Sequence, residues 1–328
     1  MSLRRFSEIY RPPRKLSVNS AGNTSWYFTL LASIQQNLLT TFRMLLRFFQ
    51  FLSIFPLSFL HAAGALAGWF VYLLSPGHRR RMRENMTRAG YLDYLPEAVA
   101  EAGKNIFELP FIWCAPAQRV LKTAVIHDWE IAQRALNDGK GVIFLTPHLG
   151  CFEIIAQAIA SRVPLTALYR PPKKNALKPL METAREREQL HLAPANLAGV
   201  RVLLKTLRKG GAIGLLPDQV PQTGEGVWAK FFGKSAYTMT LPGKLASMSG
   251  AHLILSYAKR LPRGQGYAVH FALFDAELPE DALAQATLIN NAMEKLITRC
   301  PAQYFWGYNR YKGSPDNDDP QLVEKVAQ

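Results

Sequence analysis

The residues of this chain whose types and spacing could do chemistry lie in one short segment, Thr-Pro-His-Leu-Gly-Cys-Phe-Glu over residues 146–153. His148 and Glu153 are five positions apart in it. A carboxylate bound to one ring nitrogen of a histidine fixes the tautomer and stabilises the imidazolium, so the other nitrogen can take a proton from a hydroxyl. The segment therefore indicates a general base, His148, paired with Glu153. On spacing alone, a histidine that caps a helix or fills a loop is an equal alternative.

The chain must turn within this segment if the carboxylate is to reach the imidazole. Were all six residues helical, five steps of about 100° would put His148 and Glu153 on different faces. We therefore expect His148 to lie in a loop, with Gly150 giving the backbone its freedom to turn. A substrate hydroxyl activated by His148 would attack a carbonyl such as that of a thioester, and the backbone N–H groups at the helix start are expected to stabilise the oxyanion.

The elements around the segment predict where it sits. An apolar run at Val142–Thr146, bounded by glycines and Pro147, reads as a buried strand, and Phe152–Ala160 reads as the helix that follows it. Strands separated by helices predict an α/β fold with a mixed, largely parallel sheet flanked by helices, and its chemistry belongs at the carboxyl ends of the strands. The other expected strands are Leu165–Tyr169, Ala212–Leu216, Leu253–Ala258 and Tyr267–Phe274, and the other expected helices are Glu97–Trp113, Ala198–Arg208 and Asp281–Thr298.

An uncharged, strongly apolar stretch runs from Phe48 to Gly77, although Pro56 interrupts it and His61 lies inside it. It exceeds the roughly 20 apolar residues that cross a bilayer. We expect an N-terminal hydrophobic membrane-anchoring helical segment, spanning or embedded, and a pair of buried core helices is the alternative. The expected organisation is a basic N-terminus and anchor over residues 1–90, a catalytic domain over 91–315 and a C-terminal tail over 316–328. An Arg-rich cluster at residues 78–83 follows the anchor and suits anionic headgroups.

The formal net charge of +15 points to an anionic partner, which composition alone does not identify. Nucleic acid is not expected, because the basic residues are spread through the chain and no recognition motif is present. The three cysteines form no CxxC pair, and the histidines outside the segment have no partner at metal-ligand spacing, so we expect no metal. Cys151 lacks a base of its own and is expected to be small packing filler.

Several motifs together resemble one known family. The His148 and Glu153 pair matches the His-x4-Asp/Glu (HX4E) motif of glycerolipid-type acyltransferases. From about Leu45 to Pro315 the chain resembles the lipid A biosynthesis late acyltransferases, the lauroyl and myristoyl transferases of Gram-negative bacteria. The resemblance is carried by the anchor with its Arg-rich stretch, the His148 motif, Tyr169-Arg170-Pro171, Pro217-Asp218-Gln219, Phe231-Phe232-Gly233 and Gln303-Tyr304-x-Trp306.

The resemblance implies roles for further residues. Arg170 would lie near the active site, where a guanidinium suits phosphate or phosphopantetheine oxygens. Asp218 would order the site by pairing with Arg170 or with a backbone amide, and a turn-capping aspartate is the alternative. Phe231 and Phe232 would line an acyl-chain groove, although an aromatic pair is more often core. Arg310 is assigned to substrate binding with them.

The resemblance also implies the reaction. An acyl chain would move from an acyl thioester to a hydroxyl of a phosphorylated lipid A precursor, with no bound cofactor. The expected donor is the thioester of acyl carrier protein, and acyl-coenzyme A is the alternative. The enzyme would lie at the bacterial inner membrane with its catalytic domain on the cytoplasmic face. Near the end of the chain, lauroyl-type relatives often read Trp-x-His-Arg-Arg-Phe, whereas this chain has Tyr308 and Asn309 in place of a histidine and an arginine. A lysophospholipid or lyso-ornithine-type acceptor therefore stays open.

Overall fold

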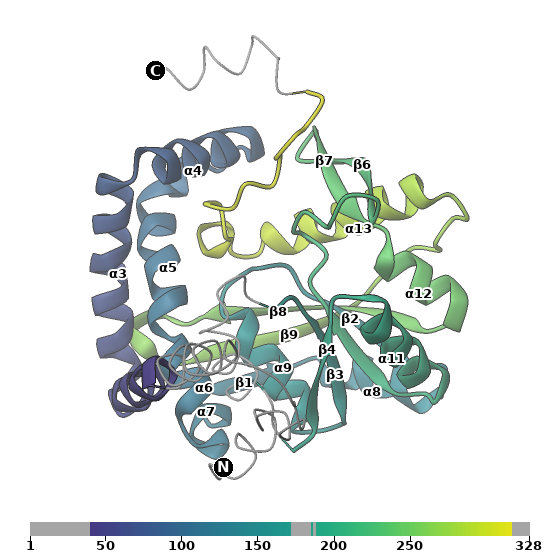
Figure 1. The fold of residues 1–328 in the computed structure, drawn as a ribbon, viewed down its shortest axis with the longest axis horizontal. Coiled ribbons are helices and arrows are strands. Elements are labelled where there is room, and N and C mark those ends of the chain that lie inside the picture. Colours follow the sequence, from purple (N-terminus) through teal and green to yellow (C-terminus); the bar gives the residue numbers. More distant parts are fainter. Residues whose placement is uncertain (1–39, 172–184, 186–187, 317–328) are drawn as a thin grey trace, which may run out of the picture.

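The computed structural model describes residues 40–171, 185 and 188–316 of the 328 (Figure 1). Its centre is a seven-stranded sheet in the order β1-β9-β8-β2-β5-β3-β4, in which β8 and β9 pair antiparallel and every other pair is parallel. The predicted mixed, largely parallel sheet is confirmed. The strands are β1 (Ala124–His127), β2 (Val142–Leu145), β3 (Leu165–Tyr169), β4 (Leu190–Pro194), β5 (Ala212–Leu215), β8 (His252–Arg260) and β9 (Tyr267–Leu273).

Helices cover both faces of this sheet, so the central strand β2 is buried on both sides. Its side chains alternate between two apolar cores, with Val142 and Phe144 in one and Ile143 and Leu145 in the other. The first core includes α6 (Leu109–Cys114), α7 (Ala117–Leu121), α8 (Trp129–Asn137) and α9 (Phe152–Ala160); the second includes α4 (Pro76–Ala89), α5 (Leu95–Phe107), α11 (Leu197–Arg208), α12 (Leu241–Ser249) and α13 (Ala282–Ile297).

A separate two-stranded hairpin, β6 (Gly226–Phe231) and β7 (Lys234–Met239), packs on α13. Phe231 pairs with Lys234, which leaves Phe232 and Gly233 as a two-residue turn with φ of 45° and 76°. Two consecutive positive φ values are the geometry that suits the twist of a tight hairpin. The hairpin was not predicted, and neither were the edge strands β1 and β4, which are only four and five residues long.

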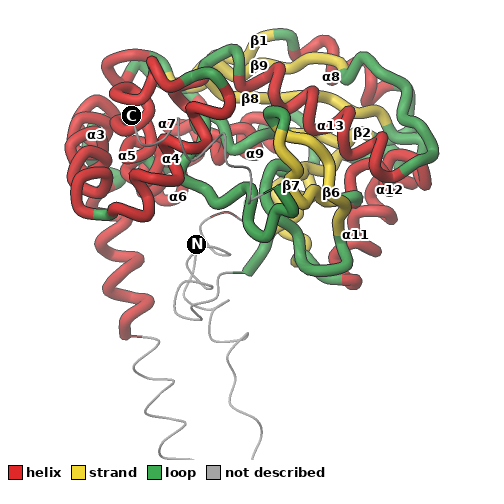
Figure 2. The backbone as a smooth tube through the Cα atoms, turned by 90° about the horizontal axis from the view of Figure 1, so that it is seen from above, coloured by secondary structure: helices red, strands yellow, loops and turns green. Residues whose placement is uncertain are grey.

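Two helices form the N-terminal part of the described chain. A helix covers residues 40–52, and Figure 2 shows it projecting away from the body. The chain then breaks before Pro56, where the Arg119 guanidinium donates hydrogen bonds to the carbonyls of Ser53, Ile54 and Phe55. α3 (Leu57–Leu74) follows, and among the described residues it is the one helix long and apolar enough to cross a membrane.

α3 lies directly against α5, and glycines make this close approach possible. A Cβ atom on Gly103 would come within 1.9 Å of the Gly64 carbonyl oxygen, and one on Gly68 within 2.2 Å of the Val99 carbonyl oxygen. Side chains at these positions would force the helices apart. One side of α3 is therefore committed to protein contact, and a third of the helix is buried.

A buried ion cluster joins α3 to the sheet. Glu108, which ends α5, accepts hydrogen bonds from Arg260 at 2.6 and 2.8 Å and from Tyr267 at 3.0 Å, and His61 of α3 lies 3.1 Å from the same carboxylate. Burial opposes ionisation of Glu108, but the charge and hydrogen bonds of Arg260, with those of His61, lower its pKa to about 2. The carboxylate therefore stays charged at physiological pH and holds the two elements together.

Because the pKa of Glu108 falls from 4.5 to about 2 on folding, its contribution to stability is complete above pH 4.5 and is lost as the pH falls toward 2. The shift corresponds to a contribution on the order of 3 kcal/mol. Glu108→Gln should lower the free energy of unfolding near neutral pH, and its difference from the native chain should shrink between pH 4.5 and about 2. Urea unfolding across this range measures the difference. Glu97→Gln, at an exposed position of the same helix, is the control, and an equal pH dependence in both variants would contradict this role.

Candidate active site

The site lies where two neighbouring strands end. β2 and β5 pair in parallel register, so the loops that follow them leave the same edge of the sheet. His148 lies in the loop after β2, and Asp218 and Gln219 lie in the loop after β5. The predicted placement of His148, after a buried strand and before a helix, is confirmed.

Asp218 holds the His148 residue at two points. The His148 Nδ1 atom donates to Asp218 Oδ1 at 2.7 Å, and the His148 backbone N–H donates to Oδ2 at 2.8 Å. The carboxylate is only 1% exposed. Burial opposes its ionisation, but the charge of His148 and these two hydrogen bonds outweigh burial, and the pKa of Asp218 lies below its usual value. An ionised carboxylate only accepts hydrogen bonds, so Nδ1 of His148 carries the proton.

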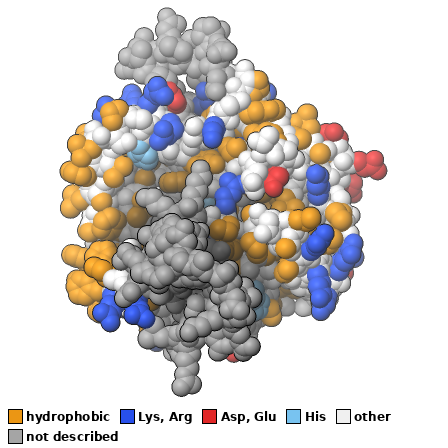
Figure 3. Space-filling model, in the orientation of Figure 1, with side chains coloured by type: hydrophobic (Ala, Val, Ile, Leu, Met, Phe, Trp, Pro, Cys, Tyr) orange, Lys and Arg blue, Asp and Glu red, His pale blue; other side chains and the backbone are white. Residues whose placement is uncertain are grey.

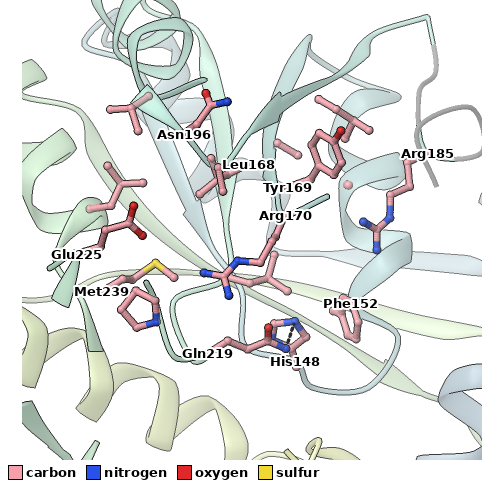
Figure 4. A pocket seen from close by; sticks show the side chains of 18 of the residues that line it. His148, Phe152, Leu168, Tyr169, Arg170, Arg185, Asn196, Gln219, Glu225 and Met239 are labelled. Atoms are coloured by element: carbon pink, nitrogen blue, oxygen red, sulfur yellow. Dashed lines mark hydrogen bonds between the residues drawn. The ribbon is translucent and has the colours of Figure 1, made fainter. Parts of the chain in front are cut away.

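With the proton on Nδ1, Nε2 is the ring nitrogen that carries the lone pair in the neutral form of the imidazole. The Gln219 side-chain amide donates to it at 3.0 Å. Figure 4 shows Gln219 beside His148 at the edge of the cavity, with this hydrogen bond drawn. His148 is thus in the tautomer that a general base requires, and its basic nitrogen faces the cavity side.

The expected pairing of His148 with Glu153 is not the one in the structure. Glu153 lies in the first turn of α9, where its Oε2 atom accepts hydrogen bonds from Trp113 Nε1 at 3.0 Å and from Arg185 Nε at 3.1 Å. The second guanidinium nitrogen of Arg185 bonds the other carboxylate oxygen, and the guanidinium also lies over the Trp113 ring. Asp218 occupies Nδ1 of His148 instead, because the loop after the adjacent strand brings it closer.

The backbone amides at the start of the motif are also already used. Those of His148, Leu149, Gly150 and Cys151 donate to Asp218, Pro147, Gln303 and Ala258, respectively, at 2.7–2.9 Å. These four amides are therefore not available to an oxyanion, whereas the contact expected from the N–H groups at the helix start stays a prediction. Gly150 turns the chain with φ of 58°, and a Cβ there would lie 1.9 Å from the Ala258 carbonyl oxygen, so its packing as well as its freedom requires glycine.

A cavity of about 590 Å³ opens beside His148. The wall of the cavity is largely aliphatic, and Glu153, Arg185 and Arg170 also line it. Figure 4 shows the Arg170 guanidinium reaching from the end of β3 toward Gln219 and His148, as the prediction for Arg170 required. The aliphatic lining includes Ala156, Leu168, Leu192, Val200, Leu216 and Leu241.

Three residues expected to bind substrate lie elsewhere. Phe231 is 1% exposed and packs in the second core, while Phe232 forms the hairpin turn against Tyr91 and Trp306. Arg310 is 2% exposed. Its guanidinium donates to the Tyr237 carbonyl and the Thr238 hydroxyl, both at 2.7 Å, which ties the chain end to the hairpin. None of the three lines the cavity, because their side chains pack in the core or hold the hairpin in place.

The buried thiol inside the motif does not serve as a nucleophile. Burial, with the nearby charge of Glu108, raises the pKa of Cys151 well above its usual value. The group therefore stays a thiol at neutral pH, whereas the reactive form of cysteine is the thiolate. Within the motif, the imidazole of His148 is therefore a better candidate for chemistry than the Cys151 thiol.

The sequence matches the model of one protein family, described as bacterial lipid A biosynthesis acyltransferase, over residues 34–313. The chain belongs to this family. It is 26% identical over 216 residues to the lipid A biosynthesis lauroyltransferase of Escherichia coli K12, covering 65% of this chain and 70% of that protein. It is 25% identical over 258 residues to the palmitoleoyltransferase of the same strain, covering 78% and 81%. A lipid A biosynthesis acyltransferase of Haemophilus influenzae is 27% identical over 289 residues, covering 82% and 89%.

This acyltransferase also contains functional candidates whose contacts were not predicted. Asp218 was expected to pair with Arg170 or with a backbone amide; the backbone amide, that of His148, is confirmed, but the pairing with the His148 ring was not predicted, and Gln219 was given no role. The available signal was a Pro-Asp-Gln sequence at the end of a predicted strand. What the sequence could not supply was the strand order, which places β5 next to β2.

The structural role of Arg310 can be separated from a role in substrate binding. In Arg310→Gln the acyltransferase loses hydrogen bonds of a buried charged group, so its free energy of unfolding should fall by about 1–3 kcal/mol. The KM for the acceptor should not change in the protein that folds. Urea unfolding and steady-state acyl transfer measure the two effects. A raised KM with unchanged stability would contradict the structural role and support a role of Arg310 in substrate binding.

Proposed function

We propose that this acyltransferase moves a fatty acyl chain from an acyl thioester to a hydroxyl of a lipid A precursor, with His148 as general base and Asp218 as the group that orients it. The observation that carries the proposal is the Nδ1 to Oδ1 hydrogen bond of 2.7 Å, which directs Nε2 toward a substrate cavity. Membership of the acyltransferase family supports the reaction class, and the family description supports the acceptor.

In the first step the acceptor hydroxyl replaces the Gln219 amide at His148 Nε2. As the hydroxyl oxygen forms its bond to the thioester carbonyl carbon, its proton passes to Nε2, and the carbonyl π electrons move to the oxygen. Asp218 stabilises the imidazolium that forms. The carbon–sulfur bond then breaks, the carbonyl reforms, and the leaving thiolate takes the proton from Nε2.

Arg170 is the group we assign to the developing negative charge. Its guanidinium extends into the cavity toward His148, and the backbone amides of residues 148–151 are engaged elsewhere. A fixed cation aimed at the carbonyl oxygen stabilises the tetrahedral intermediate without reorganising at the moment of reaction. The same group suits the phosphate oxygens of a phosphopantetheine arm.

The aliphatic cavity is the proposed site of the acyl chain. Burying each methylene contributes about 0.8 kcal/mol, so an apolar wall beside the base favours a long chain with its carbonyl at His148. Glu153, Arg185 and Trp113 form one bonded unit in the wall of this cavity. In this proposal Glu153 positions Arg185 and shapes the entry to the site. It does not hold the imidazole of His148, as was first expected.

The proposed donor and the alternative acceptors are all compatible with this base. An acyl thioester of acyl carrier protein is the proposed donor, with acyl-coenzyme A as the alternative, and the chemistry needs no bound cofactor. A lysophospholipid or lyso-ornithine-type acceptor would use the same base, and the family match favours lipid A. Mass spectrometry of lipid A from a deletion strain separates them, because loss of one secondary chain supports the lipid A acceptor.

We place the enzyme at the bacterial inner membrane with the catalytic domain on the cytoplasmic face. The side of α3 away from α5 presents Leu66, Phe70 and Leu74, which are 74%, 66% and 65% exposed. Figure 3 shows hydrophobic side chains gathered along the edge that α3 forms. The projecting helix over residues 40–52 adds exposed Phe48 and Phe51. An apolar surface of this extent is typical of a membrane contact.

The assignment of the base and its partner predicts a ranking of variants. His148→Ala should reduce kcat by about 10³-fold or more, in the range that general-base catalysis supplies. Asp218→Asn should reduce kcat by a similar factor because it disfavours the required tautomer. Glu153→Gln should be milder and act mainly on KM. Steady-state transfer by folded proteins tests the ranking, and normal turnover by Asp218→Asn would overturn the proposed pair.

The membrane assignment predicts a loss of vesicle binding. Each large apolar side chain contributes about 1.5–3 kcal/mol when buried, so Leu66→Glu with Phe70→Glu should lower partitioning into anionic vesicles by more than about 100-fold. The control is Met248→Glu with Leu283→Glu, which changes two exposed apolar residues on α12 and α13. Flotation measures both. Equal retention of the two double variants would contradict a membrane-facing α3.

A further inference from the structure

A second, polar cavity of about 190 Å³ lies between α4, the start of β7 and the chain segment 309–313. Its lining includes Arg81 and Arg88 of α4, Lys234 of β7 and Lys312. Among the described residues Glu84 is the one carboxylate in the lining, and it pairs at 3.6 Å with Arg80, which is outside the cavity. Positive charge in this recess therefore exceeds the negative charge that the lining supplies.

Two of these cations converge on one aromatic ring. The Arg88 guanidinium lies 5.1 Å and the Lys234 ammonium 5.7 Å from the centre of the buried Tyr311 ring. The Nε atom of Arg88 is buried and has no hydrogen-bond partner in the part of the chain that the structure describes. An unpartnered donor on a charged group beside the recess adds to its unbalanced positive charge, so the arrangement favours an anion from outside the described chain.

We propose that this cavity is a phosphate-binding site. Guanidinium and ammonium groups that converge on a small recess match the several acceptor oxygens and the charge of a phosphate group. The recess is concave and narrow, which favours a single oxyanion over the broad acidic surface of a protein partner. Figure 3 shows basic side chains gathered over the part of the surface that α4 forms.

A continuous segment joins this cavity to the catalytic site. The Phe305 N–H donates to the His148 carbonyl at 3.1 Å, and four to eight residues later the same segment lines the cavity. Asn85 of α4 donates to the carbonyls of Trp306 and Tyr308 at 2.7 and 2.9 Å, which fixes α4 against the segment. A lipid with its phosphate in the cavity would thus be held by the same framework as the base. This link to the acceptor rests on the proposed function, whereas phosphate binding does not.

The first experiment titrates inorganic phosphate into the purified full chain at constant ionic strength, with binding followed by ³¹P NMR line broadening. Arg88→Gln and Lys312→Gln should each weaken the apparent affinity about tenfold, the factor that about 1.4 kcal/mol produces. Lys312 is exposed, so its variant does not depend on the fold tolerating a change near Tyr311.

A control makes the result specific. Arg83→Gln removes the same charge from α4 outside the cavity lining. This variant should bind phosphate as the native chain does. The proposal is overturned if the native chain shows no saturable binding, if both cavity variants bind normally, or if Arg83→Gln loses as much affinity as they do.

The source of the phosphate is decided by kinetics. With a phosphorylated lipid acceptor, Lys312→Gln should raise KM about tenfold, and with the same acceptor after phosphatase treatment it should not. That outcome identifies the acceptor's own phosphate. An unchanged KM with both acceptors, alongside lost phosphate binding, supports the site and identifies a bilayer headgroup as the source. Failure of acyl transfer altogether would reject the proposed function and leave the binding result standing.

Discussion

The hydrogen bond between His148 and Asp218 is the interaction on which the site depends, and it exists because two parallel strands are neighbours. β2 and β5 end at the same edge of the sheet, and each contributes one member of the pair from the loop that follows it. The buried carboxylate also accepts a hydrogen bond from the His148 backbone N–H, so it fixes both the ring and the loop. Ring orientation, tautomer and the direction of Nε2 all follow from this one contact.

The rest of the fold keeps this edge rigid. The ion cluster of Glu108 and Arg260 lies beneath the catalytic loop, and Cys151 and Gly150 of that loop contact β8 through the Ala258 carbonyl. The same cluster reaches α3 through His61. The apolar helix is consequently built into the framework of the catalytic domain, which gives the proposed membrane-facing surface a fixed position relative to the base.

Much of this arrangement was predictable from the sequence. Buried parallel strands are continuous apolar runs, so β2, β3 and β5 were placed within one residue of their ends, and His148 followed from β2. Pairings between segments distant in sequence were not predictable, because strand order carries no local signal. This is why Glu153, nearby in sequence, was expected where Asp218 lies. The substrate-binding roles expected for Phe231 and Arg310 were wrong for a related reason, since the hairpin that buries both side chains was not predicted.

The most direct test of the central claim is the proton NMR signal of the His148 Nδ1 proton in protein labelled with ¹⁵N-histidine. A short hydrogen bond to a buried carboxylate protects this proton from exchange and shifts it strongly downfield. The signal should persist in Glu153→Gln and disappear in Asp218→Asn. Loss of the signal in Glu153→Gln, with its retention in Asp218→Asn, would contradict the account.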